Sequence, residues 1–254
     1  MANILDRYGI KEVADVTFYK IKENGEPGAP ALFLDTLKVS TIEQTAEQAE
    51  ARGGKGNPPL IIWDYGKEIT VTLEDALFSA KSMAIMFGDG EVVEGDKKIR
   101  KTWSKKFETL PADDYKFEYG DKEFAYSELK AGGVFYNEKG EIVEVDGDAL
   151  KGVAFFFTAD IPVANMGVIE VSANTFPGTY YVTGDTYARS EVTGADEFFQ
   201  FIIPKAKMNA ENTITLEAEG DPSVFNMTLR VLRPADGKMM KLVKYDFNED
   251  VAQG

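Results

Sequence analysis

The residue types that carry most enzymatic chemistry are missing from this chain. The sequence contains no Cys and no His, which excludes thiol nucleophiles, imidazole bases, disulfides and Cys/His metal sites. An acidic run of Glu141, Glu144, Asp146 and Asp148 offers carboxylates, but its spacing does not fit an EF-hand loop and is typical of hairpin tips. We therefore predict no enzyme activity, no cofactor and no metal site.

A basic cluster around Trp103 is the feature that most resembles a nucleic-acid site. Lysines neutralise phosphates and an indole can stack on a base. The whole chain, however, has 28 Lys and Arg against 43 Asp and Glu, a formal net charge of -15, which opposes binding to a polyanion. We interpret the cluster as a solvated loop or as a contact with an acidic patch on a neighbouring subunit. Its members are Lys97, Lys98, Arg100, Lys101, Lys105 and Lys106.

Two other features argue against phosphate binding and membrane insertion. The glycine-rich residues 53–57 lack the spacing of a phosphate-binding loop and lead into Pro58 and Pro59 rather than into a helix, so we predict a flexible turn. Charged residues interrupt the apolar ones in the first 19 positions, unlike in a signal peptide. No segment has the roughly 20 apolar residues that cross a bilayer. We expect a soluble protein without a membrane partner.

The elements that must position these residues are mostly strands. Glycine, proline, asparagine and aspartate punctuate the chain at short intervals, and the segments between them are rich in β-branched and aromatic residues. In residues 67–72, apolar and polar side chains alternate, which indicates a strand with one buried face. The predicted strands are residues 60–65, 67–72, 152–159, 168–173, 179–187 and 197–203.

A hairpin is predicted near the C-terminus, with arms at 212–219 and 223–232 around a Gly-Asp-Pro turn. Apolar residues alternate with polar ones in both arms, so one face of the hairpin is apolar and the other must meet water or a polar partner. The polar face carries Thr213, Thr215, Glu217, Glu219, Asn226, Thr228 and Arg230.

One helix and one ambiguous segment complete the pattern. Thr72 followed by Asp75 resembles a capping box, the apolar residues from Leu73 to Phe87 recur at helical spacing, and Gly88 is a stop signal. Residues 42–51 have the composition of a helix but few large apolar side chains, so an extended or disorder-prone interaction arm is at least as good an alternative. We predict one domain over residues 1–254, with an inserted hairpin region at about 96–150.

Several strings in this chain resemble the major tail tube protein of long-tailed bacteriophages. The longest is ARGGKGNPPLIIWDYGKEITVTLEDALFS at residues 51–79. Others are FPGTYY at 176–181, FQFIIPK at 199–205 and GDPSVFNM at 220–227. The matches are scattered over most of the chain outside residues 96–150, and none of them is a catalytic signature.

The resemblance implies a β-sandwich or β-barrel with a flanking helix, whose copies form hexameric rings that stack into a hollow tube. Such a virion protein would be assembled in the host cytoplasm, would contact sheath, baseplate and tail terminator proteins, and would let DNA pass without binding it. An acidic surface suits such a conduit, because like charges repel.

On this interpretation, the polar hairpin face is a candidate lumen wall, with a solvated sheet exterior as the alternative. Residues 40–57 form the candidate arm that orders against a neighbouring subunit or ring. The candidate inter-subunit residues are Thr41, Glu43, Arg52, Lys55, Lys97, Lys98, Arg100, Lys101 and Trp103.

Two other functions remain open from the sequence. The first is a monomeric β-sandwich that binds carbohydrate through Trp63, Trp103, Tyr180 or Tyr181, although adjacent strand residues such as the two tyrosines face opposite sides. The second is another component of the same assembly class, such as a terminator, a baseplate hub or the tube of a secretion system.

Overall fold

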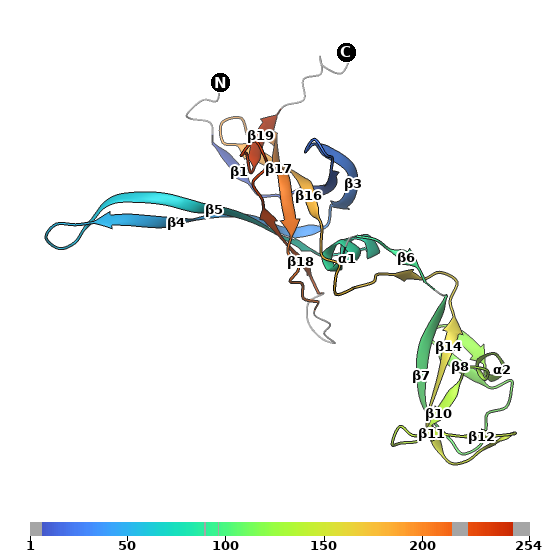
Figure 1. Ribbon diagram of the computed structural model, residues 1–254. Coiled ribbons are helices and arrows are strands. Elements are labelled where there is room, and N and C mark those ends of the chain that lie inside the picture. Colours follow the sequence, from blue (N-terminus) through green and yellow to red (C-terminus); the bar gives the residue numbers. More distant parts are fainter. Residues whose placement is uncertain (1–6, 89, 96, 215–222, 246–254) are drawn as a thin grey trace. The chain divides into compact units, whose positions relative to one another are not determined.

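The computed structural model describes residues 7–88, 90–95, 97–214 and 223–245. The chain divides into two compact units (Figure 1). Unit 1 consists of Met1–Val92 and Ile169–Gly254, and unit 2 consists of Val93–Val168. Unit 2 is therefore inserted in the sequence between two parts of unit 1.

One antiparallel sheet makes up most of unit 1. Its strand order is β3-β2-β16-β17-β18-β5-β4, while β1 pairs with β16 and β19 pairs with β17. Over the described residues, β3 and β4 each pair on one side only, so the sheet is not a closed barrel. The predicted mainly β fold is confirmed. The strands of this sheet are β1 (Tyr8–Ile10), β2 (Asp15–Ile21), β3 (Pro27–Leu34), β4 (Leu37–Arg52), β5 (Pro59–Asp75), β16 (Thr179–Ser190), β17 (Asp196–Met208), β18 (Phe225–Val231) and β19 (Lys241–Tyr245).

The core of unit 1 is built from alternate residues of these strands. On β5, Val71 and Leu73 are fully buried, whereas the intervening Thr72 is only half-buried on the other face. Burying a side chain of this size contributes about 1.5–3 kcal/mol, so the apolar face fixes the register of each strand. Other fully buried residues of this core are Val16, Phe18, Val182, Ile203, Met227 and Leu229.

Most predicted strands lie inside observed ones. The segments at 179–187 and 197–203 fall within β16 and β17. The segments at 60–65 and 67–72 belong to the single strand β5, which passes through Gly66 without ending. The segment at 168–173 is wrong beyond its first residue, because the strand β15 (Gly167–Val168) already ends there.

The helix α1 (Ala80–Phe87) begins later than the sequence predicts. Its N-cap is Ser79, whose side chain accepts a hydrogen bond from a backbone N–H of the first turn. It ends before Gly88, as predicted. The predicted N-cap at Thr72 is wrong, because Thr72 and Leu73 are part of β5 and Leu73 is fully buried in the core of the sheet.

The predicted C-terminal hairpin is described only in part. Its second arm is the strand β18, which alternates between buried and more exposed residues as expected. Residues 212–214 of the first arm form no strand, and residues 215–222 lie outside the described ranges. Over the described residues, β18 pairs with β5 and with β17.

Unit 2 has a small sheet and an aromatic core of its own. The sheet order is β11-β10-β14-β7, and the short pairs β8–β9, β12–β13 and β6–β15 accompany it. Phe157 is fully buried, and its ring centre lies 4.6 Å from that of Phe117 and 4.7 Å from that of Phe135. The elements are β6 (Val93–Glu94), β7 (Lys98–Phe107), β8 (Lys116–Tyr119), β9 (Lys122–Ala125), α2 (Tyr126–Leu129), β10 (Val134–Tyr136), β11 (Ile142–Val143), β12 (Val145–Asp146), β13 (Ala149–Leu150), β14 (Ala154–Pro162) and β15.

Candidate assembly surface

A long two-stranded hairpin continues β4 and β5 past the rest of the unit 1 sheet (Figure 1). The two strands pair along the whole of β4. The neighbouring strand β18 pairs with β5 only over residues 70–75, so residues 59–69 have β4 as their partner strand among the described residues. We call residues 43–68 the arm. The extended alternative for residues 42–51 is thereby confirmed and the helical alternative is wrong.

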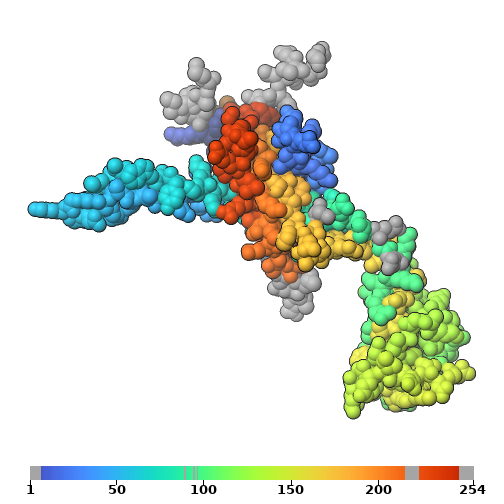
Figure 2. Space-filling model, in the orientation of Figure 1, coloured from blue at the N-terminus to red at the C-terminus, as the bar shows by residue number. Residues whose placement is uncertain are grey.

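The arm is solvent-exposed along nearly its whole length, and Figure 2 shows it standing clear of the body of unit 1. Its strand β5 nevertheless carries a run of large apolar residues. Trp63 keeps 53% of its surface exposed, and Leu60 keeps 65%. The other members of the run, Ile61, Ile62 and Tyr65, are each at least half exposed. Isolated exposed apolar residues are ordinary, but a contiguous patch marks an interaction site.

The strand register divides this run between two faces of the arm. Trp63 lies opposite Ala49, and Ile61 lies opposite Ala51. Because directly paired residues share a face and alternate residues return to it, Ile61, Trp63 and Tyr65 line one face with two alanines beside them. Alanine is too small to cover an indole ring. We call this side the aromatic face.

The opposite side of the arm is more polar. The side-chain amide of Gln48 donates a hydrogen bond of 2.9 Å to Asp64, its cross-strand partner. Arg52 forms an ion pair of 2.5 Å with Glu50. These contacts pair polar groups of that side within the arm, although Leu60 and Ile62 are exposed there as well.

A projecting hairpin of this kind is poorly stabilised by itself. Two-stranded hairpins without a covering layer are marginal in water, and both long edges of the arm leave backbone hydrogen-bonding groups for another chain. Covering a large apolar side chain completely contributes about 1.5–3 kcal/mol. Covering the aromatic face would therefore stabilise the arm.

The arm holds three of the predicted inter-subunit residues, and a fourth lies next to it. Glu43 and Arg52 are exposed on β4, as is Thr41 just before the arm. Lys55 is exposed in the turn that joins the two strands. In that turn, Asn57 has a φ of 50°, a left-handed conformation that asparagine tolerates better than most residues.

The remaining predicted inter-subunit residues lie in unit 2, on or beside β7. Arg100 makes a two-pronged ion pair with Asp160, at 2.7 and 3.1 Å. This hydrogen bonding lowers the pKa of Asp160 below its ordinary value. The ammonium group of Lys101 lies 3.9 Å from the ring centre of Tyr119. Lys98 is exposed at the start of the strand, and Lys97, just before it, has a φ of 56°.

Trp103 is partly buried and packs against the core of unit 2. Its ring centre lies 5.0 Å from that of Phe117 and 6.0 Å from that of Phe157. Its indole Nε1 donates a hydrogen bond of 2.8 Å to the carbonyl oxygen of Glu118. These contacts fix the ring as a packing element, so it is not a free platform for stacking on a base or a sugar.

Three lumen candidates, Asn226, Thr228 and Arg230, lie on β18 and pair with residues of β5. Asn226 faces Glu74 across the ladder, and Thr228 faces Thr72. Arg230 faces Thr70 and forms an ion pair with Glu68. A polar strip therefore runs over β5 and β18. The sequence already indicated the part on β5, because polar and apolar residues alternate in residues 67–72. Of the other candidates, Thr213 is exposed outside any strand, and Thr215, Glu217 and Glu219 lie outside the described residues.

The aromatic residues considered for carbohydrate binding do not form one platform. Tyr180 is buried at 5% exposure against Phe18, and Tyr181 lies on the opposite face of β16 beside Tyr19. Trp63 is exposed, but it is a separate feature on the arm.

The described residues were also compared with the requirements of a metal-ion cluster and of a membrane-spanning helix. No group of three or more acidic side chains among them is placed to hold a metal ion. Asp146, from the acidic run, lies 3.2 Å from Lys151. None of the helices in the described ranges is long and apolar enough to span a bilayer.

Comparison with known proteins places these features in a family. The model of the YomU/Tube protein family matches residues 8–105 and 161–244, which together cover most of the chain. A protein of Bacillus phage SPR that is named "Tail tube protein" is 27% identical over 221 residues, which cover 82% of this chain and 78% of that protein. These matches confirm the resemblance to tail tube proteins. They join this chain to structural proteins rather than to enzymes, and the chain belongs to the YomU/Tube protein family.

Proposed function

We propose that this protein is the subunit of a phage tail tube, and that its copies form hexameric rings that stack into a hollow conduit for DNA. The observation that carries the proposal is the arm, a paired hairpin whose aromatic face is uncovered in the single chain. The family match and the name of the phage relative support it. The protein makes and breaks no bond, and DNA passes through without specific binding.

The free edges of the unit 1 sheet support assembly through neighbouring copies. An open antiparallel sheet exposes backbone donors and acceptors at both ends, and closing a ring removes such edges. The first and last strands, β3 and β4, are the available edges over the described part of the sheet. Unit 2 is an elaborated insertion of a single tube-forming domain. The other partners are the sheath, baseplate and terminator proteins that the tube meets in a virion assembled in the host cytoplasm.

The test is negative-stain electron microscopy of the purified protein over a concentration series, together with sedimentation velocity. We expect hollow rings or tubes whose amount rises with concentration, because assembly follows mass action. A monomer of 28.1 kDa at every concentration, even after tube fragments are added as seeds, would contradict the proposal. In that case, a glycan-binding screen would test the carbohydrate alternative.

The polar strip on β5 and β18 is proposed as the lumen wall, and it gives a second prediction. Changing Thr72 and Thr228 to lysine places two positive charges side by side on that wall. We expect tubes of normal length but slower DNA ejection, since the cations attract phosphate. The matched control changes both residues to glutamate and should eject DNA at the normal rate. Ejection is measured by fluorescence of the released DNA, and equal rates for the two variants would reject the lumen assignment.

A further inference from the structure

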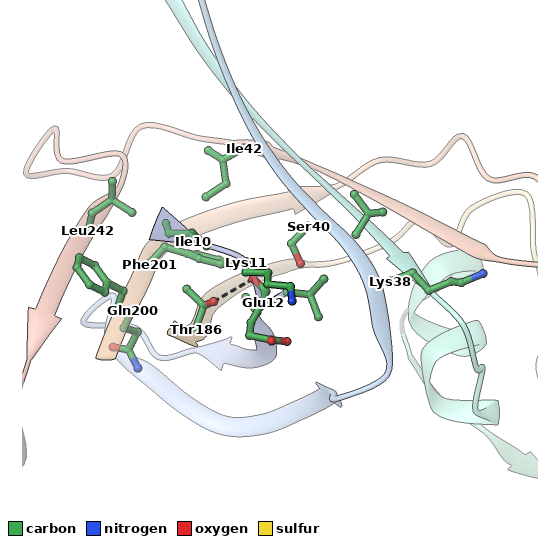
Figure 3. Close-up of a pocket in the computed structure, with 14 residues that line it drawn as sticks. Ile10, Lys11, Glu12, Lys38, Ser40, Ile42, Thr186, Gln200, Phe201 and Leu242 are labelled. Atoms are coloured by element: carbon green, nitrogen blue, oxygen red, sulfur yellow. Dashed lines mark hydrogen bonds between the residues drawn. The ribbon is translucent and has the colours of Figure 1, made fainter. Parts of the chain in front are cut away.

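An apolar groove lies at the base of the arm in unit 1 (Figure 3). Its volume is about 500 Å³. It is bordered by the first residues of β4, by the segment that follows β1, and by β16, β17 and β19. The apolar side chains that line it include Ile10, Val13, Val39, Ile42, Phe199, Phe201 and Leu242.

The rim of the groove is as exposed as the arm. Leu242 keeps 72% of its surface exposed and Ile10 keeps 65%. Figure 3 shows them on one side of the groove, with Ser40 and Ile42 of β4 across from Ile10. The hydroxyl of Ser40 is buried without a hydrogen-bond partner among the described residues. A buried, unsatisfied hydroxyl is unfavourable, and a chain that enters the groove can supply its partner.

We propose that the groove is the docking site for the aromatic face of the arm of a second copy. This inference rests on the proposed function and names the surface that the arm recognises. Trp63 and Tyr65 are the anchors, because large aromatic rings that enter an apolar pocket dominate the energy of interfaces. Their counterparts are the exposed rim of Leu242 and Ile10 and the apolar lining beneath it.

The arm cannot fill the groove of its own chain. Ile42 lines the groove, and the strand continues from it into the arm as a paired ladder. Ala49, opposite Trp63, therefore lies roughly 23 Å further along the strand at about 3.3 Å per residue. A two-stranded ladder cannot fold back on itself within so few residues. The occupant is therefore another copy, and the contact is head-to-tail.

The charges of the two surfaces are partly complementary. Lys11 and Lys38 line the groove together with one carboxylate, Glu12, so the lining carries one net positive charge. Neither lysine forms an ion pair with a described residue. Glu47 lies on the aromatic face opposite Tyr65 and is likewise without an ion-pair partner among the described residues. Opposite charges at the edge of an apolar contact steer association and fix its register.

The test uses full-length variants that each damage one side of the contact. Trp63→Asp removes the anchor of the arm, and Leu242→Asp charges the rim of the groove. Both positions are at least half exposed, so both variants should fold, which circular dichroism checks. Val192→Asp is the matched control, because Val192 is 73% exposed and belongs to neither surface.

We expect each damaging variant alone to remain monomeric in sedimentation velocity, while the control assembles like the unmodified protein. An equimolar mixture of Trp63→Asp and Leu242→Asp should give dimers. The reason is that the intact arm of the second variant meets the intact groove of the first, while the reverse contact is lost. Tubes formed by Leu242→Asp at the normal concentration, or a mixture that stays monomeric, would overturn the groove assignment.

A cross-linking measurement keeps the inference testable if a variant fails to fold. The chain has no cysteine, so Ala49→Cys combined with Leu242→Cys provides two unique thiols on the two surfaces. We expect covalent oligomers on oxidation that dithiothreitol reverses, and none with Ala49→Cys and Val192→Cys. Failure of the unmodified protein to assemble contradicts the proposed function. Assembly of the unmodified protein without the specific cross-link contradicts only the groove.

Discussion

Replacing residues 45–68 by an Asn-Gly turn is expected to give a folded protein that no longer polymerises. Gln44 and Ile69 are cross-strand partners, and a two-residue turn joins such a pair with the right twist. Every removed strand residue except Ala51 is exposed, and none belongs to the core of unit 1. The thermal unfolding temperature should therefore change little, while the aromatic face is lost completely.

The cut is placed to spare the sheet. Deleting residues 40–57 instead would remove the strand that pairs with the buried part of β5, because Ser40 faces Leu73 and Ile42 faces Val71. The matched control shortens only the tip, by replacing residues 53–58 with Asn-Gly between the partners Arg52 and Pro59. Sedimentation velocity and microscopy are the measurements. The arm assignment is wrong if the long deletion still forms tubes, or if the tip variant loses them equally.

Phe157→Ala is expected to unfold unit 2 selectively. Phe157 is fully buried, and the rings of Phe117, Phe135, Tyr126 and Trp103 surround it. Removing a buried phenylalanine costs about 3–5 kcal/mol. That is a large part of the free energy of unfolding available to so small a unit.

The two tryptophans allow a specific measurement. Trp63 lies on the arm, and Trp103 packs against the core of unit 2. A Trp63→Phe background therefore leaves Trp103 as the reporter of unit 2 in urea titrations. Phe156→Ala is the control, because Phe156 is the half-buried neighbour on the other face of β14. We expect a much smaller loss there. Equal losses at the two positions would mean that the aromatic core does not hold unit 2 together.

The same variant tests whether the insertion takes part in assembly. The family match leaves out residues 106–160, which include most of unit 2. If this unit decorates the outside of the tube, Phe157→Ala should still polymerise in the background that retains Trp63. If the variant loses both the unfolding transition of unit 2 and the ability to form tubes, the insertion takes part in assembly.

Several local features could be predicted because they depend on neighbouring residues only. The alternation in residues 179–187 and 197–203 predicted two strands, and both are present. Gly88 was predicted to end the helix, and it does. The start of the helix was misplaced because the spacing of Leu73, Ala76 and Leu77 also fits a strand followed by a loop. The pairing of Leu73 between β4 and β18 decides in favour of the strand.

The candidate site was only partly visible in the sequence. The composition of residues 42–51 left helix and extended arm equally open, because the choice depends on pairing with β5, which is distant in the chain. The aromatic face went unnoticed for the same reason. The run Leu-Ile-Ile-Trp of residues 60–63 resembles an ordinary buried strand, and only the cross-strand alanines and the missing outer neighbour leave Trp63 uncovered.

The sequence by itself determined the mainly β class, the lack of Cys and His chemistry and the acidic charge, since these follow from residue types and local periodicity. The resemblance to tail tube proteins rested on whole strings such as residues 51–79. The tertiary structure alone decided which strands are neighbours. That choice brings Ser40, Leu242 and Ile10 into one groove, and it leaves the arm without a covering layer. Both are consequences of long-range strand pairing. A period-two pattern is compatible with many strand registers, and only packing within the sheet selects one of them.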